Sequence, residues 1–200
     1  MRRGPATHQA ILSHATGLAS QVGLSGLTIG TLADDLELSK SGLFAHFRSK
    51  EALQIQVLEY AAASFEQHVV LPSLKEPRGE PRIRMLFERW LAWDRDRMLP
   101  GGCVFVAAAS ELDDRPGPAR DCLVGMQREW LEVLSRSFLK GIKAGLFRAD
   151  GDPEQFAQDL YGIMLSYHHH ARLMNDPQAE TRAGKAFERL LDAARAHHRG

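Results

Sequence analysis

The stretch LTIGTLADDLELSKSGLFAHFRSKEAL, residues 27–53, decides the fold. It begins with Thr28, whose hydroxyl is placed to accept a hydrogen bond from the first turn of a helix in which apolar residues recur at helical spacing. Ser39 is a second cap of this kind, and the helix that it begins runs to about Phe47. A third helix follows Ser49. These signals predict two short helices joined by a tight turn, and then a longer helix.

An earlier helix completes a three-helix unit. Its apolar stripe consists of Ile11, Ala15, Leu18, Ala19 and Val22, and Gly23 and Gly26 mark its end. Two short helices with a tight turn between them place the second helix in the major groove of DNA. The pattern therefore predicts a DNA-binding domain over residues 1–52, with a generic helical hairpin as the alternative.

The whole string T-I-x-x-L-A-x-x-L-x-L-S-x-S-x-L-F-x-H-F-x-S-K-E-x-L, from Thr28 to Leu53, resembles the N-terminal domain of the TetR family of transcriptional regulators. The resemblance implies an all-α fold, in which the helix-turn-helix domain of residues 1–52 is followed by a larger helical ligand-binding and dimerisation domain of residues 53–200. It also implies a homodimer that binds a near-palindromic operator in double-stranded DNA and is released by a small-molecule effector.

The outward side of the second short helix is the expected DNA-reading surface. We expect DNA contacts from Thr28, Ser39, Lys40, Ser41, Gly42, Phe44, His46 and Lys50. Phosphate contacts would come from the first turns of the capped helices, from His46 and from Lys50. Base contacts would come from Lys40, Ser41 and Phe44. TetR members usually carry tyrosine at the position of Phe44, and its hydroxyl commonly contacts a phosphate. Without that hydroxyl, we expect phosphate positioning and DNA shape to carry more of the specificity.

Composition limits the class of protein. The 25 basic and 25 acidic residues give a formal charge of zero, so positive charge facing DNA must be local. Arg2 and Arg3 form either an arm that reaches DNA or a solvated terminus. No apolar run reaches the roughly 18 residues of a membrane span, the N-terminus has no hydrophobic export-signal core, and two cysteines make no disulfide framework. We therefore expect a cytoplasmic protein with no membrane, metal or cofactor partner.

The rest of the chain reads as helices separated by proline- and glycine-containing joints, including LPSLKEPRGEP at residues 71–81. Helices are predicted over residues 51–70, 82–98, 103–113, 118–146, from 153 onward, and about 179–197. The last two have apolar faces that would form a four-helix bundle between two copies. The candidates for this dimer interface are Phe156, Leu160, Ile163, Tyr167, Phe187, Leu190, Leu191 and Ala194. The alternative is that these faces serve the core of one subunit.

Aromatic residues and methionines with a few polar groups suit a pocket for an apolar small molecule. The candidates for the effector pocket are Trp90, Trp93, Met98, Cys103, Phe105, Met126, Trp130, Tyr161, Met164 and His168. Each of them is also explained as an ordinary core residue. His168, His169 and His170 are adjacent and point in different directions along a helix, which argues against a metal site.

The stretch GGCVFVAAASELDDRPGPARD, residues 101–121, resembles the start of the regulatory domain in one TetR subgroup. Within it, Glu111, Asp113 and Asp114 are expected to cap or solvate a helix end, and Cys103 to be buried and unreactive. The rival interpretation is an all-helical enzyme or carrier, for example a Cys103-dependent one, whose helix-turn-helix is purely structural. We expect a regulator without catalytic residues, acting as a repressor; an activator is a third possibility, because the sign depends on operator position.

Overall fold

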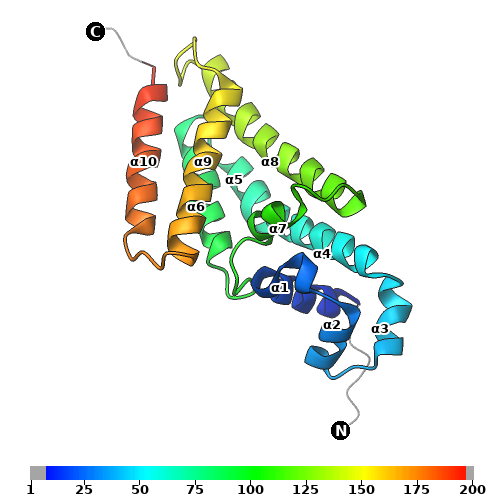
Figure 1. The fold of residues 1–200 in the computed structure, drawn as a ribbon. Coiled ribbons are helices and arrows are strands. Elements are labelled where there is room, and N and C mark those ends of the chain that lie inside the picture. Colours follow the sequence, from blue (N-terminus) through cyan, green and yellow to red (C-terminus); the bar gives the residue numbers. More distant parts are fainter. Residues whose placement is uncertain (1–7, 197–200) are drawn as a thin grey trace. The chain divides into compact units, whose positions relative to one another are not determined.

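The computed structural model describes residues 8–196 and is helical, with no β-strand in that span (Figure 1). The expected all-α class is therefore confirmed. The residues group into two compact units: the chain up to Ser64 together with Arg95–Met126, and Phe65–Asp94 together with the chain from Gln127 onward. Arg2 and Arg3 lie outside the described residues. Within residues 8–196, none of the helices has both the length and the apolar character needed to cross a membrane.

The first unit contains the predicted helix-turn-helix. Its helices are α1 (His8–Gly26), α2 (Ile29–Leu36), α3 (Lys40–Phe47), α4 (Lys50–Phe65), α7 (Val104–Leu112) and the start of α8 (Pro118–Lys143). The last residue of α4, Phe65, belongs to the second unit. The side chains of Leu32, Leu43 and Phe47 are completely or almost completely buried, which holds α2 and α3 together. The two short helices and the turn between them follow the residues predicted from the sequence.

A second contact in the first unit joins α1 to the segment that leads into α7. The backbone N–H of Gly101 donates a hydrogen bond to Ser20 Oγ over 2.9 Å. A methyl group on Gly101 would lie 1.6 Å from the Ser20 carbonyl oxygen, so only glycine allows the two backbones to approach this closely. The segment before α7 therefore contacts the backbone of α1 directly, and α7 itself packs against α1.

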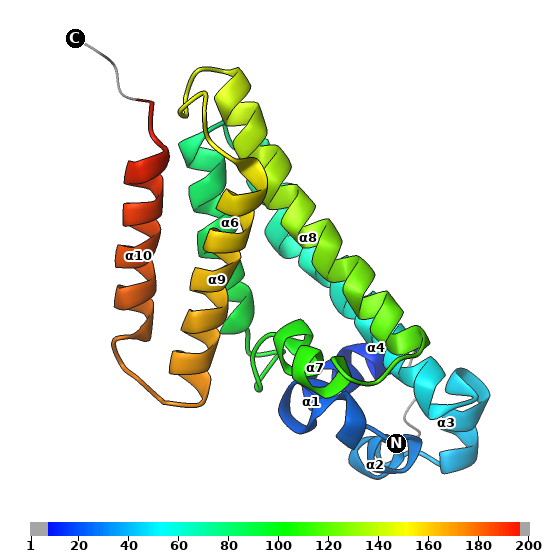
Figure 2. The same cartoon turned by 45° about the horizontal axis from the view of Figure 1, so that its top comes forward.

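The second unit contains the π-helical turn η1 (Glu66–Val70), α5 (Leu71–Lys75), α6 (Glu80–Asp94), the rest of α8, α9 (Pro153–Arg172) and α10 (Ala179–Ala194). Helices α9 and α10 lie side by side (Figures 1 and 2). Stacked aromatic rings form much of the core: the ring centroids of Phe138 and Phe156 are 4.0 Å apart, and those of Phe87 and Phe187 are 4.2 Å apart. Such pairs add to the free energy gained by burying their surface.

The turn η1 has an identifiable cause in Pro72. Proline has no N–H, so the carbonyl of His68 loses its usual partner four residues on. The helix widens at this point, with the Leu71 N–H bonded to the Glu66 carbonyl, and Arg89 Nη1 donates to the His68 oxygen over 3.0 Å. A side chain from α6 thus completes the backbone bonding, and the helix continues through residues that we had predicted as a joint.

A cluster of charged side chains ties α6 to the end of α10. Arg195 donates hydrogen bonds to both carboxylate oxygens of Glu80 over 2.9 Å, and Arg84 Nε donates to Glu80 Oε1 over 2.8 Å. Arg84 also reaches Glu188 on α10. The hydrogen bond from Arg195, followed by that from Arg84, lowers the pKa of Glu80 from 4.5 to about 2, although partial burial opposes this change.

The helix bounds differ from the predictions mainly at the ends. The helix predicted over 82–98 ends at Asp94, the one over 118–146 ends at Lys143, and α10 ends at Ala194 rather than near 197. The prediction of a joint over residues 71–81 was wrong for its first half, which forms α5. The two compact units do not coincide with the domains expected at residues 1–52 and 53–200, because residues 95–126 pack with the N-terminal helices.

Candidate functional site

Helix α3 divides into a buried and an exposed face. Ser39 caps it in an extended conformation, and its Oγ accepts a hydrogen bond from the Gly42 N–H over 3.1 Å. Leu43 faces the core, whereas Lys40, Ser41 and Phe44 are exposed, with 53% of Phe44 accessible to solvent. An aromatic ring exposed to this extent gains little from the fold, so it is available to a partner.

Position 42 carries glycine although it lies within a helix. A methyl group there would lie 3.0 Å from Ser39 Oγ, the oxygen that caps the helix. An alanine would have to displace that oxygen by a few tenths of an ångström. The small residue therefore leaves the cap undisturbed, and it also leaves the exposed face of α3 open beside Ser41.

The start of α2 lies close to Lys40. Thr28 caps α2: its Oγ1 accepts from the Thr31 N–H over 3.0 Å, and Thr31 Oγ1 accepts from the Thr28 N–H over 2.9 Å. A methyl group on Gly30 would lie 3.9 Å from Lys40 Nζ, so the ammonium lies over the first turn of α2. The helix dipole and the lysine together make this exposed corner favourable for an anion.

The two remaining candidates for DNA contact already have partners within the first unit. The His46 ring centroid lies 5.4 Å from that of His8, and His46 is exposed. The Lys50 ammonium donates a hydrogen bond to the backbone carbonyl of Ser25, at the end of α1. Lys50 therefore holds α4 to α1 in this structure, in addition to any contact that it makes with a phosphate.

The effector-pocket candidates are divided between the two units. Met98, Cys103, Phe105 and Met126 belong to the first unit, and Trp90, Trp93, Trp130, Tyr161, Met164 and His168 to the second. Within the first unit Cys103 is buried at the start of α7, and Met98 is 61% exposed. The sequence could not separate these groups, because residue type does not reveal which neighbour a side chain contacts, and Met98 lies in the turn between α6 and α7 rather than on the helix predicted to reach it.

Within the second unit, Phe65 joins two of the tryptophans. Its ring meets Trp93 and Trp130 edge-on, with centroids 5.4 and 5.0 Å away. Next to Trp93 in the chain, Asp94 is buried, and its Oδ1 lies 2.6 Å from Nδ1 of His168, whose side chain is 15% exposed. Asp94 is not among the site residues predicted from the sequence. The signal that could have identified it is an acidic residue within the apolar stripe of α6.

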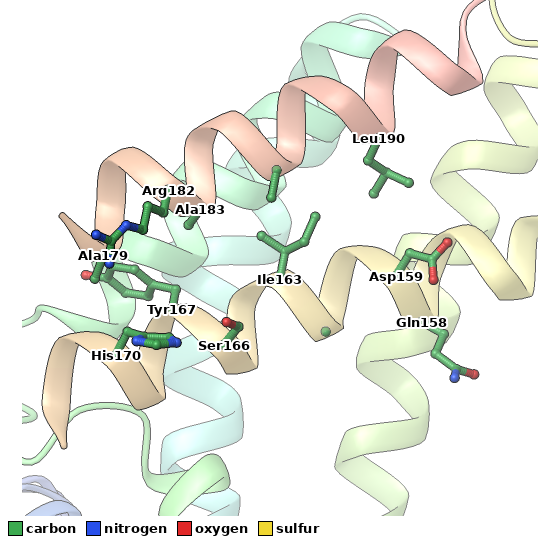
Figure 3. Close-up of a pocket in the computed structure, with 12 residues that line it drawn as sticks. Gln158, Asp159, Ile163, Ser166, Tyr167, His170, Ala179, Arg182, Ala183 and Leu190 are labelled. Atoms are coloured by element: carbon green, nitrogen blue, oxygen red, sulfur yellow. The ribbon is translucent and has the colours of Figure 1, made fainter. Parts of the chain in front are cut away.

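The dimer candidates lie on both sides of the α9–α10 contact. Six of them are buried within their own unit: Phe156, Leu160, Tyr167, Phe187, Leu191 and Ala194. Ile163 and Leu190 are half-buried and project toward one another across a groove of about 660 Å³ between α9 and α10 (Figure 3). A second groove, of about 740 Å³, runs between α8 and α9 and includes the exposed Leu165. Gly162 lines both grooves.

Comparison with known proteins identifies the family. The model for "Bacterial regulatory proteins, tetR family" matches residues 11–57, and that for "Tetracyclin repressor-like, C-terminal domain" matches residues 79–187. The transcriptional repressor NemR of Escherichia coli K12 is 26% identical over 169 residues, 84% of each chain. The repressor DhaR of Mycobacterium sp. GP1 is 24% identical over 160 residues, 80% of this chain and 79% of DhaR.

The fold is similar to that of solved TetR structures. A TetR regulator from Chloroflexus aurantiacus superposes with a TM-score of 0.84 at 24% identity, covering 98% of this chain and all of that one. These matches favour a regulator over the enzyme or carrier that we considered from the sequence. The chain belongs to the TetR family of DNA-binding transcriptional regulators.

Proposed function

We propose that this regulator is a repressor that binds a near-palindromic operator as a homodimer and leaves it when a small-molecule effector binds. The observation that carries the proposal is the division of α3, which buries Leu43 and exposes Lys40, Ser41 and Phe44. A helix divided in this way can enter the major groove while its other face stays packed on α2.

The contacts follow from the geometry of the exposed corner. Ser41 and Phe44 face outward from α3 and would meet base edges, with the Phe44 ring against a thymine methyl group. Lys40 lies between α3 and the first turn of α2, where it would bind a phosphate and also reach a base edge. With few hydrogen-bonding groups on this face, DNA shape would supply much of the specificity.

Selection of duplexes from a random library tests the DNA-binding surface. The selected duplex should be a near-palindrome, and its affinity, measured by fluorescence anisotropy, should fall steeply between about 50 and 200 mM salt because phosphate contacts release counterions. An affinity that barely changes with salt would contradict the mechanism. Lys40→Ala and Ser41→Ala should weaken binding with little change in the preferred sequence, because DNA shape is expected to supply most of the specificity; clearly relaxed preference at one defined base pair would show that direct readout dominates instead.

A second copy of the chain would cover the two grooves that flank α9. Both grooves are open, both include Gly162, and Ile163, Leu165 and Leu190 supply apolar surface. A glycine at this position lets a second helix approach closely, as in helix bundles formed by two copies. Two subunits related by a twofold axis would present two α3 helices to successive major grooves, about 34 Å apart.

The effector would bind in the second unit near the tryptophans. Trp130 is 7% exposed, and within residues 8–196 its indole Nε1 has no hydrogen-bond partner. A buried donor of this kind suits a ligand that carries a hydrogen-bond acceptor among apolar groups. The Trp130→Phe variant keeps an aromatic ring but removes the donor. It should bind operator normally and respond less to compounds that release the parent protein; an unchanged response would exclude this role for Trp130.

The sign of regulation is tested in a reporter strain. With the selected operator overlapping a promoter, the protein should lower transcription, and an inducing compound should restore it. Activation from operators at every tested position would overturn the assignment as a repressor.

A further inference from the structure

Leu24 and Ser25, which lie just before the helix-turn-helix, are held by a carboxylate from a distant part of the chain. The N–H of Leu24 donates to Glu111 Oε1 over 3.1 Å, and the N–H of Ser25 donates to Oε2 over 2.7 Å. Glu111 lies on α7, within the Gly101–Asp121 stretch. Both of its carboxylate oxygens are thus bonded to the backbone at the end of α1, and all of these residues belong to the first unit.

A break in α1 explains why a carboxylate is needed here. Gly23 has φ 75° and ψ 165°, so the helix stops and a new turn begins at Leu24. The first N–H groups of a new turn have no partner within it, and a negative charge is favourable at that position. A methyl group on Gly23 would lie 2.0 Å from Glu111 Oε1. Glycine is therefore required both by the backbone conformation and by the space that the carboxylate occupies.

Three further side chains bind the same two residues. Gln54 Nε2 donates to the Leu24 carbonyl over 2.7 Å, and the Lys50 ammonium donates to the Ser25 carbonyl. Arg115, just after α7, donates from Nη1 to Ser25 Oγ over 3.0 Å. The carbonyl groups of the turn are therefore bound by α4, its N–H groups by Glu111 of α7, and the Ser25 hydroxyl by Arg115.

This turn leads straight into the DNA-reading helices. The N–H of Leu27 bonds to the Gly23 carbonyl over 3.2 Å, and the next residue, Thr28, caps α2. The side chain of Leu27 is completely buried. A displacement of α7 along α1 would therefore move the start of α2 through Glu111, and α3 with it.

We propose that Glu111 is a positioning residue for operator binding, through which α7 sets the place of the helix-turn-helix. It touches no DNA; it acts through Leu24 and Ser25. The same contact gives α7 a means of passing on a change in the regulatory part of the chain. This proposal rests on the function proposed above, because it assumes that α2 and α3 bind the operator.

The first test compares Glu111→Gln with Asp114→Asn. Both variants remove one negative charge, but Asp114 is exposed just after α7 and, among residues 8–196, binds no backbone group of α1. The probe is the duplex that the unaltered protein selects. Glu111→Gln should weaken binding about tenfold, within the range of couplings between sites, while Asp114→Asn stays within about twofold. Equal effects of the two variants would overturn the proposal.

The dependence on salt separates positioning from a loss of folded protein. If Glu111→Gln displaces the helix-turn-helix, α2 and α3 should contact fewer phosphates. The slope of log affinity against log salt should then become shallower by about one. A variant that is only less stable has fewer active molecules but the same slope. An unchanged slope would therefore assign Glu111 a structural role alone and overturn the proposal.

A measurement without DNA completes the design. Amide hydrogen exchange of a peptide containing Leu24 and Ser25 should accelerate at least about tenfold in Glu111→Gln and remain unchanged in Asp114→Asn. Unaltered exchange at these amides would show that Glu111 does not hold the turn. If the unaltered protein selects no duplex, the function proposed above fails, and the exchange result still decides whether Glu111 fixes the start of α2.

Discussion

The Glu80 cluster makes part of the stability of this protein dependent on pH. Arg195 and Arg84 donate hydrogen bonds to the Glu80 carboxylate, and they lower its pKa from 4.5 to about 2. Because the pKa is lower in the folded state, the stabilising effect is fully present above pH 4.5 and is lost as the pH falls from 4.5 toward 2. Replacing Glu80 by glutamine should remove this dependence on pH.

The size of the effect follows from the pKa and from exposure. At 1.36 kcal/mol for each pKa unit, a fall from 4.5 to about 2 corresponds to at most about 3.4 kcal/mol. The Glu80 side chain is 28% exposed and that of Arg195 is 41% exposed, so solvent screens the interaction. We expect Glu80→Gln to lower the free energy of unfolding by about 1–2 kcal/mol at pH 7, by less than half as much at pH 3, and hardly at all below pH 2.

Urea unfolding at a fixed protein concentration measures this difference. The parent protein and Glu80→Gln should be compared at pH 7, 5, 4 and 3. Asp150→Asn is the matched control, because Asp150 pairs with Arg148 at the surface after α8, with side chains 70% and 45% exposed. That variant should change stability far less than Glu80→Gln does at pH 7. A gap between parent and Glu80→Gln that is the same at pH 3 and pH 7 would refute the reasoning.

Three further outcomes are expected. Phe44→Tyr should bind the selected operator about tenfold more tightly at unchanged stability, because its hydroxyl can reach a phosphate; equal or weaker binding in anisotropy would count against the proposed docking. Gly162→Glu should leave the subunit folded, since no atom outside its own helix lies within 4 Å of the added Cβ, but should give monomers in light scattering, whereas Gly125→Glu should remain dimeric. Ser39→Ala should destabilise α3 by about 1 kcal/mol and weaken operator binding, and a variant with both quantities unchanged would show that the cap is dispensable.

The local part of the fold could be predicted from the sequence. The caps at Thr28 and Ser39, and the buried pair Leu43 and Phe47, follow from residue type and helical spacing. These signals need no knowledge of distant residues. For the same reason they located the exposed face of α3 together with the residues that we propose contact DNA.

What the sequence could not predict depends on partners far along the chain. The helix continues past Pro72 because Arg89 binds the carbonyl that the proline leaves without a donor, and no local pattern reveals that contact. Glu111 reads as an acid at a helix end, yet it caps a turn 86 residues earlier. Likewise, an apolar helix face does not say which neighbour covers it: Leu160 and Phe187 satisfy the dimer pattern but are buried in their own unit.

The placement of the tryptophans has a practical consequence. All three in the chain, Trp90, Trp93 and Trp130, lie in the second unit, and the unit that carries α2 and α3 has none. When only indole is excited, light is therefore emitted solely from the unit where we propose that the effector binds. A shift in the wavelength of tryptophan emission on adding the duplex would then report that DNA binding to the first unit changes the environment of the indoles in the second, without any attached dye.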